Sequence, residues 1–213
     1  MFERLFRSWN EKAGTDMALS SDTALLEAAV QGNADALASL YRRHGALIYR
    51  FSLRMCQDSS IAEEVTQEVF LALIRQCDRF DSSQAALSTW LCGIARRQVW
   101  KHLERLHRSR PGDLLELDGE DERYEVESPD DDPAVLLTRK EAVARVHRGI
   151  DELPAQWREV IVLCELEEMS YEEAAQVMAV PIGTIRSRLH RARSRLKSLL
   201  LNEPVSGGKE RVR

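Results

Sequence analysis

The chain has 213 residues, of which 44% are hydrophobic and 31% charged, a composition typical of a soluble globular protein with exposed helices. With only 10 Gly and 6 Pro, and few β-branched runs, the sequence predicts a mostly α-helical fold. No stretch approaches the ~20 apolar residues of a membrane span, and the N-terminus lacks the apolar core of a signal peptide, so we expect a cytoplasmic protein without membrane insertion.

The net charge of −5 does not exclude nucleic-acid binding, because the charge is segregated. Residues 112–133 contain eleven acids and one Arg, a net charge of −10. The rest of the chain therefore carries +5, since −5 minus −10 is +5.

The four cysteines form no CxxC pair and have apolar neighbours, so we expect buried or half-buried thiols and no metal site. A redox or metal switch is the alternative. These residues are Cys56, Cys77, Cys92 and Cys164.

Residues 1–21 form a leader that we expect to be flexible, although an amphipathic turn built on its aromatic residues is the alternative and Met17 is a second candidate start. Residues 22–109 are predicted to be a first helical domain. Asp22 is expected to cap its first helix, Gly32 and Asn33 to break that helix, Ser60 and Glu63 to form a capping box, and Ser88 to cap a helix over 89–108.

The helix over 60–76 has an apolar side and an acidic side. Val65, Val69 and Leu73 can pack inward, whereas the opposite face is acidic and polar. An acidic face repels DNA, so it is expected to meet solvent, the commoner case, or a protein partner. The residues of that face are Glu63, Glu64, Gln67 and Glu68.

The helix over 89–108 is apolar on one side and basic on the other. Its apolar stripe comprises Leu91, Ile94, Ala95, Val99, Leu103 and Leu106, and its basic row Arg97, Lys101 and Arg105, with Arg96 and Arg108 nearby. Trp100 lies beside this row, and aromatic rings next to cations suit single-stranded nucleic acid. A core position for Trp100 is equally open, and Trp90 is expected to be a core residue.

Residues 110–133 are predicted to be a flexible acidic linker, 134–201 a second helical domain, and 202–213 a flexible tail. In the second domain, helices are expected from Pro133 to about Leu153 and from Pro154 to about Leu166. A helix-turn-helix follows them. Ser170 and Glu173 form a capping box, Ala174, Ala175 and Met178 face inward, Ala179 and Val180 form the turn, and Pro181 precedes the next helix.

That last helix is the most informative segment of the chain. Ile185, Leu189, Ala192, Leu196 and Leu199 form a buried stripe, and residues 181–197 contain six Arg or Lys and no acid. A solvated basic helix is the simple alternative, but this pattern favours a polyanion on the exposed side. Gly183, Ser187, His190, Arg191 and Ser194 lie opposite the stripe, with Arg186, Arg193 and Lys197 on one flank and Arg188 and Arg195 on the other.

Several passages together resemble the sigma factors of bacterial RNA polymerase, specifically the extracytoplasmic-function (ECF) group. AEEVTQEVFLAL (62–73) is similar to the family's polymerase-binding helix, and RFDSSQAALSTWLCGIARR (79–97) to its promoter-melting loop and helix. LPAQWREVIVLCELEEMSYEEAAQVMAVPIGTIRSRLHRARSRL (153–196) closely follows the family's second DNA-binding domain.

The resemblance assigns site residues to three surfaces, and it implies neither cofactor nor catalytic activity. The polymerase-binding residues would be Glu64, Gln67, Glu68 and Phe70. Those handling the minus-ten strand would be Arg96, Arg97, Trp100, Lys101, Ser82 and Ser83, and those meeting the minus-thirty-five duplex Thr184, Arg186, Ser187, Arg188, His190 and Arg191. Arg97 stands where Asn is usual and Lys101 where Asp is common, which leaves the base preference at the minus-ten element open.

The implied function is promoter recognition, DNA melting and transcription initiation together with core polymerase. The implied partners are the β′ clamp helices and β flap of core RNA polymerase, promoter DNA and an anti-sigma factor. A stand-alone helix-turn-helix regulator of duplex operators is the alternative, although the sequence has no obvious dimerisation helix or ligand pocket. No nucleotide-binding loop or deaminase-type zinc motif supports a nucleic-acid enzyme.

Overall fold

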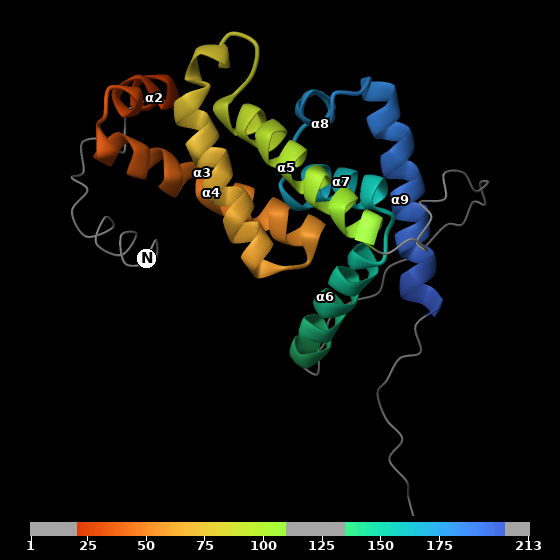
Figure 1. Ribbon diagram of the computed structural model, residues 1–213. Helices are drawn as coiled ribbons and strands as arrows, with labels where there is room; N and C mark the ends of the chain where they lie inside the picture. Colours follow the sequence, from red (N-terminus) through yellow and green to blue (C-terminus); the bar gives the residue numbers. More distant parts are fainter. Residues whose placement is uncertain (1–20, 110–134, 203–213) are drawn as a thin grey trace, which may run out of the picture.

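The computed structural model describes residues 21–109 and 135–202, and all regular structure in these ranges is helical (Figure 1). The expected leader, linker and tail lie largely or wholly outside the described residues, as do Met17 and Pro133. The first half contains α2 (Asp22–Val30), α3 (Ala34–Cys56), α4 (Ser59–Arg75), the short η2 (Cys77–Arg79) and α5 (Leu87–Ser109). The second contains α6 (Val135–Asp151), α7 (Ala155–Ile161), the π turn η3 (Val162–Leu166), α8 (Tyr171–Met178) and α9 (Ile182–Asn202).

Three helices of the first half do not begin at the cap that the sequence predicted. Ser21, not Asp22, caps α2, and Asp58 caps α4 by accepting from the backbone N–H groups of Ser60 and Ile61 at 2.8 and 3.1 Å. The Asp58 carboxylate takes the place of a capping box at Ser60, because it already satisfies the first exposed donors of the helix. Ser88 lies inside α5, which begins at the buried Leu87.

The core of the first half follows the expected apolar pattern. Leu91, Ile94, Ala95 and Val99 of α5 are buried, as are Val65, Val69 and Leu73 of α4. Leu103 is only partly buried, and Leu106 is 48% exposed, because α5 runs beyond the helices that cover its first turns. Trp90 is half-buried beside Phe80, with ring centroids 5.6 Å apart.

The two halves pack against each other. α5 runs through the middle of the molecule and contacts α8, while α3 contacts α7 and η3 (Figure 1). Buried apolar side chains from both halves form one continuous cluster. Within the described ranges, no helix has the length and apolar character needed to cross a membrane. The packing brings the basic face of α5 next to residues of the second half.

Candidate polymerase and nucleic-acid interfaces

The helix-turn-helix of α8 and α9 forms as its sequence predicts. The backbone N–H of Glu173 donates to Ser170 Oγ at 3.2 Å, and that of Ser170 donates to Glu173 Oε2 at 2.9 Å, which completes the capping box. Ala174, Ala175 and Met178 are buried. Ala179 turns the chain in the left-handed region, with a φ of 53°.

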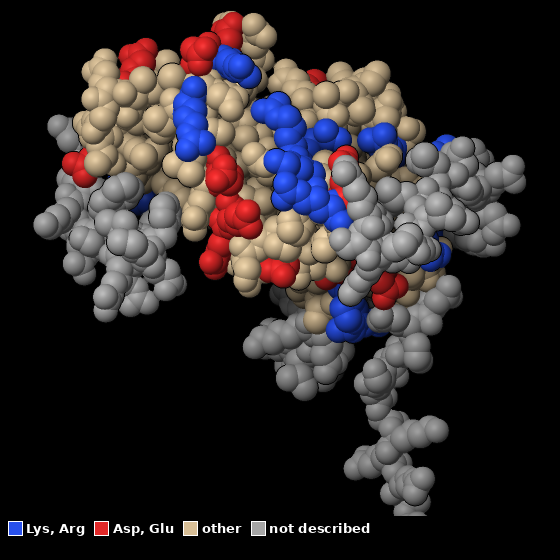
Figure 2. All heavy atoms as spheres, viewed as in Figure 1, with Lys and Arg blue, Asp and Glu red and all other residues tan. Residues whose placement is uncertain are grey.

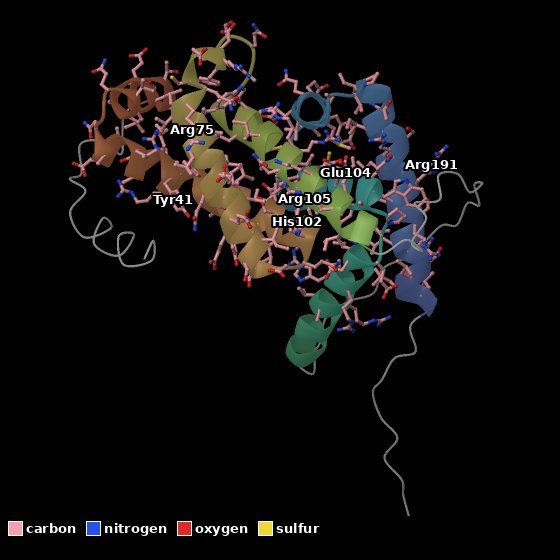
Figure 3. The ribbon with its side chains drawn as sticks, viewed as in Figure 1. Tyr41, Arg75, His102, Glu104, Arg105 and Arg191 are labelled. Carbon is pink, nitrogen blue, oxygen red and sulfur yellow. The ribbon has the colours of Figure 1, made fainter. Side chains whose placement is uncertain are left out.

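One face of α9 is exposed to solvent. Ile185, Leu189 and Ala192 are buried, while Leu196 and Leu199 pack partly against the core. The exposed face contains the residues predicted to meet the minus-thirty-five duplex, namely Arg186, Ser187, His190 and Arg191. Arg191 points outward from the helix (Figure 3). Thr184 is half-buried, and its carbonyl accepts the Ser187 hydroxyl at 3.1 Å.

The flanks of α9 are partly occupied by acids of the same half. Arg193 forms an ion pair with Glu165, and this hydrogen bond raises the pKa of Arg193. Arg188 is half-buried and close enough to Glu159 to affect its titration. The central face of α9 is therefore better placed to meet a duplex than its flanks.

The basic residues of α5 divide into two groups. Arg97 and Lys101 are exposed, and Figure 2 shows Lys and Arg side chains gathered over this helix. Arg96 and Trp100 are half-buried and turn toward α7. The structure thus separates the residues that were expected to handle the minus-ten strand.

A hollow of about 500 Å³ lies between α4 and α5, next to the exposed part of this basic row. Its lining combines two guanidinium groups, an indole and two amides, which suits a base and its phosphate better than an apolar ligand. The lining residues are Ala72, Gln76, Arg79, Trp90, Ile94, Arg97 and Gln98.

The loop before α5 is organised by Asp81. Its carboxylate accepts the Ser83 backbone N–H at 2.9 Å, the Ser83 hydroxyl at 2.7 Å and the Gln84 amide at 2.7 Å. The Ser83 hydrogen bonds, followed by that of Gln84, lower the pKa of Asp81. Ser82 and Ser83 are both exposed, but the hydroxyl of Ser83 is directed at Asp81.

The acidic face of α4 is exposed next to the basic row of α5, as Figure 2 shows. Glu64 and Glu68 are exposed and Gln67 is half-buried. Phe70 is only 6% exposed, and its ring packs against Tyr41 with centroids 4.7 Å apart. Phe70 therefore supports this face from the core and does not form part of its surface.

The cysteines are buried or half-buried, as expected. Burial raises the pKa of Cys56 and Cys164 to about 11 and that of Cys92 to about 12. These thiols stay protonated at neutral pH, which disfavours thiolate chemistry.

Two charged residues of α7 were not identified from the sequence. Arg158 donates to backbone carbonyls of both halves, and Glu159 is fully buried against α5. Glu159 lies at i, i+4, i+7 spacing with Leu163 and Leu166, on what the sequence shows as an apolar stripe. An acidic residue within an apolar stripe indicates a buried, paired carboxylate. Its partners, about 60 residues earlier in the chain, have no such signal.

Comparison with known proteins identifies the family of the chain. The Sigma-70 region 2 family matches residues 40–109, and the Sigma-70, region 4 family matches residues 144–196. The RNA polymerase sigma-H factor of Pseudomonas aeruginosa is 32% identical over 185 residues, covering 84% of this chain and 93% of the relative. The ECF RNA polymerase sigma factor SigW of Bacillus subtilis is 27% identical, covering 80% of this chain and 91% of the relative.

Two solved structures have a similar fold. One is that of CnrH in complex with the cytosolic domain of CnrY, with a TM-score of 0.61 and 25% identity over 87% of this chain and all of that chain. The other is the sigma factor RpoE in complex with the anti-sigma factor NepR from Bartonella quintana, with a TM-score of 0.56 and 24% identity, covering 77% of this chain and 96% of that chain.

The fold, the two family matches and the full-length relatives place the chain in the sigma-70 family of RNA polymerase sigma factors. Within that family it belongs to the ECF group.

Proposed function

We infer that this sigma factor binds core RNA polymerase and directs promoter recognition, DNA melting and transcription initiation, without catalytic activity of its own and in the cytoplasm. The observation that carries this function is the presence of two basic helix faces, on α5 and α9, with an exposed acidic helix beside the first. A stand-alone repressor would need only the duplex-binding face of α9. The hollow between α4 and α5 and the acidic face of α4 would have no function in such a protein.

Each exposed face is assigned the binding partner that suits its charge and side chains. Glu64 and Glu68 of α4, with Gln67 between them and Phe70 beneath, bind the polymerase clamp helices. Arg97, Lys101 and the loop with Ser82 and Ser83 meet the minus-ten strand, and Arg96 and Trp100 join them when accessible. The exposed residues of α9, with Thr184 and Arg188 beside them, meet the minus-thirty-five duplex.

The proposed domain limits are 22–109 for the region 2-like unit and 134–201 for the region 4-like unit, joined by the acidic linker 110–133. The linker's net charge of −10 suits a basic channel of polymerase, and the second unit would also contact the β flap. An anti-sigma factor is a further proposed partner, supported by the similar fold of a sigma factor solved with one.

A pull-down and run-off assay with purified core polymerase tests this function. The chain should associate with core polymerase and start transcription at defined sites on a genomic fragment library, and the shared upstream sequences would give its promoter. Reversing Glu64 and Glu68 to Lys should weaken association by about tenfold or more, since it places like charges across a charged interface. Reversing Glu172, an exposed acid of α8, is the matched control and should leave association unchanged.

Two results would contradict the proposal. Absence of association between the wild-type chain and core polymerase would remove the sigma function. Tight, salt-resistant binding of the isolated chain to a duplex operator would favour the stand-alone regulator.

A further inference from the structure

A leucine interrupts the charged outer face of α4. Leu71 is 47% exposed, although it is a large apolar side chain well inside a helix of 17 residues. At about 100° per residue, it lies within about 60° of the exposed Glu64 and Glu68, so the three side chains share one face. α4 therefore presents two carboxylates and an apolar group to solvent on the same surface.

The exposure of Leu71 does not come from the end of a core stripe. Val65, Val69 and Leu73 form the buried side of α4, and Leu73 points about 160° away from Leu71. Leu106 of α5 is different, because it continues the buried stripe of its helix past the helices that cover it. A single exposed leucine is ordinary, but one set opposite the core and among charged residues favours a contact surface.

The neighbouring Phe70 is not available as the apolar group of this surface. It is only 6% exposed, and its ring packs against Tyr41 of α3 with centroids 4.7 Å apart. A partner that reaches the outer face of α4 therefore meets Leu71, while Phe70 supports the helix from behind. The apolar contact residue of this helix thus differs from the one that the family resemblance assigned.

The charge on this face changes sign after Leu71. Arg75 is exposed one helical turn beyond it, near the C-terminal end of α4 (Figure 3). Among the residues that the structure describes, Glu64, Glu68 and Arg75 form no ion pair, so their charges are available to a partner. The face extends about 16 Å along the helix axis from Glu64 to Arg75, or about three helical turns.

A partner that matches this face must carry the complementary groups in the same order. It needs cations opposite Glu64 and Glu68, an apolar recess for Leu71 and a carboxylate opposite Arg75. Buried apolar anchors ringed by polar groups contribute most of the affinity at protein interfaces, whereas the surrounding charges select the partner and fix its register. An amphipathic helix of mixed charge fits this description, and a uniformly basic surface does not, because it would repel Arg75.

We propose that Leu71 is the apolar anchor through which α4 binds the clamp helices of core polymerase, and that Arg75 fixes their register by pairing with an acid. The inference rests on the proposed function for the identity of the partner. It adds two residues to the predicted polymerase-binding set and gives Phe70 a supporting role from the core.

The test uses the full-length chain, labelled at its N-terminus, and purified core polymerase without DNA. Fluorescence anisotropy gives the affinity at about 0.1 and about 0.5 M salt, where exposed charges are screened to different extents. Leu71→Ala should weaken association by about tenfold at both salt concentrations, because an apolar contact is not screened. The loss caused by reversing Glu64 and Glu68 to Lys should instead shrink as salt rises.

Further variants make the result specific. Leu106→Ala is the matched control, because it truncates a leucine that is 48% exposed and outside this face, and it should leave association unchanged. Leu71→Met keeps an apolar side chain of similar volume and should retain most of the affinity. Arg75→Glu makes the face more acidic, yet it should weaken association by about tenfold, since it places like charges together. Arg75→Gln should give a smaller loss.

The anchor is overturned if Leu71→Ala binds core polymerase as tightly as the wild type, or if its loss disappears at high salt. The register is overturned if Arg75→Glu binds as tightly as the wild type or more tightly, which would make the face a uniform acidic patch. If Leu71→Ala loses its helical circular dichroism signal, Leu71→Gln decides by the same criteria. A wild-type chain that fails to bind core polymerase would reject the proposed function and this inference with it, whereas a binding wild type with an unaffected Leu71→Ala rejects the inference alone.

Discussion

α5 and α9 have similar patterns of apolar and basic residues but different surroundings. Each is an amphipathic helix with one apolar stripe and a series of arginines, and each was expected to meet DNA. On α9 the residues opposite the stripe are exposed, except for the half-buried Ser194. On α5, Arg97 and Lys101 are exposed, whereas Arg96 and Trp100 bind Glu159 of the other half. The comparison shows that helical periodicity locates a basic face, but a partner distant in sequence decides which of its residues are accessible.

The largest effect on stability is expected from Arg158, which donates hydrogen bonds to backbone carbonyls in both halves of the molecule. Its guanidinium donates to the carbonyls of Ile150, Asp151 and Leu153 near the end of α6, and to that of Met55 in α3, over 2.5 to 3.3 Å. Arg158→Ala should lower the free energy of unfolding by about 3 kcal/mol, because several buried carbonyls lose a charged donor. Urea denaturation followed by circular dichroism measures this change.

Arg186→Ala is the matched control for that variant. It removes the same side chain from an exposed position of α9 and should change stability by no more than about 0.5 kcal/mol. Equal stability of the two variants would mean that the Arg158 hydrogen bonds do not stabilise the fold.

The next effect concerns the exposed face of α9. Arg191→Ala should reduce transcription from a promoter that depends on its minus-thirty-five element by about tenfold, the loss expected for one good contact to DNA. Run-off transcription with reconstituted holoenzyme measures it. Arg195→Ala, on a flank, should give a smaller loss that is similar for different upstream sequences, because phosphate contacts are not sequence-specific. An unchanged rate for Arg191→Ala would assign the reading face elsewhere.

Local sequence signals predicted much of the fold. The all-α class, the apolar stripes of α5 and α9, and the capping box at Ser170 follow from periodicity and short-range chemistry. The structure confirms them, except that the last members of each stripe are exposed or only partly buried. Helix starts were less predictable where several polar residues compete, as at Asp58 and Ser60, since either can satisfy the same N–H groups.

For the candidate sites, the sequence predicted which helix face is polar or charged, but not which residues of that face are accessible. On α9 and α4 most of the predicted residues are exposed as expected, whereas Thr184, Arg188 and Gln67 are half-buried. Phe70 is in the core, because the same side chain completes the packing against Tyr41. The inward turn of Arg96 and Trp100 depends on Glu159, 63 and 59 positions away, and no local pattern encodes such a contact.

A smaller effect, on the salt dependence of DNA binding, is expected at the flank of α9 that contains Arg193. Glu165→Gln removes the acid that binds Arg193, so one more cation becomes available to phosphate. The slope of log K against log salt for the minus-thirty-five duplex should then become steeper by about 0.9. Fluorescence anisotropy across a salt series measures the slope. Glu172→Gln should leave it unchanged, and an unchanged slope for Glu165→Gln would show that the ion pair with Glu165 does not control any contact of Arg193 with phosphate.

The smallest effect is expected at the turn that sets α9 against α8. Ala179 has a φ of 53°, a conformation that costs an L-residue about 1–2 kcal/mol but suits glycine. Glycine also loses more backbone freedom on folding, so Ala179→Gly should raise the free energy of unfolding by a net ~0.5 kcal/mol. Ala34→Gly, at the first residue of α3, should instead lower it, because no strain is relieved there. If both variants lose stability, the left-handed turn is not strained, and the orientation of the exposed DNA face depends on α8–α9 packing rather than on this residue.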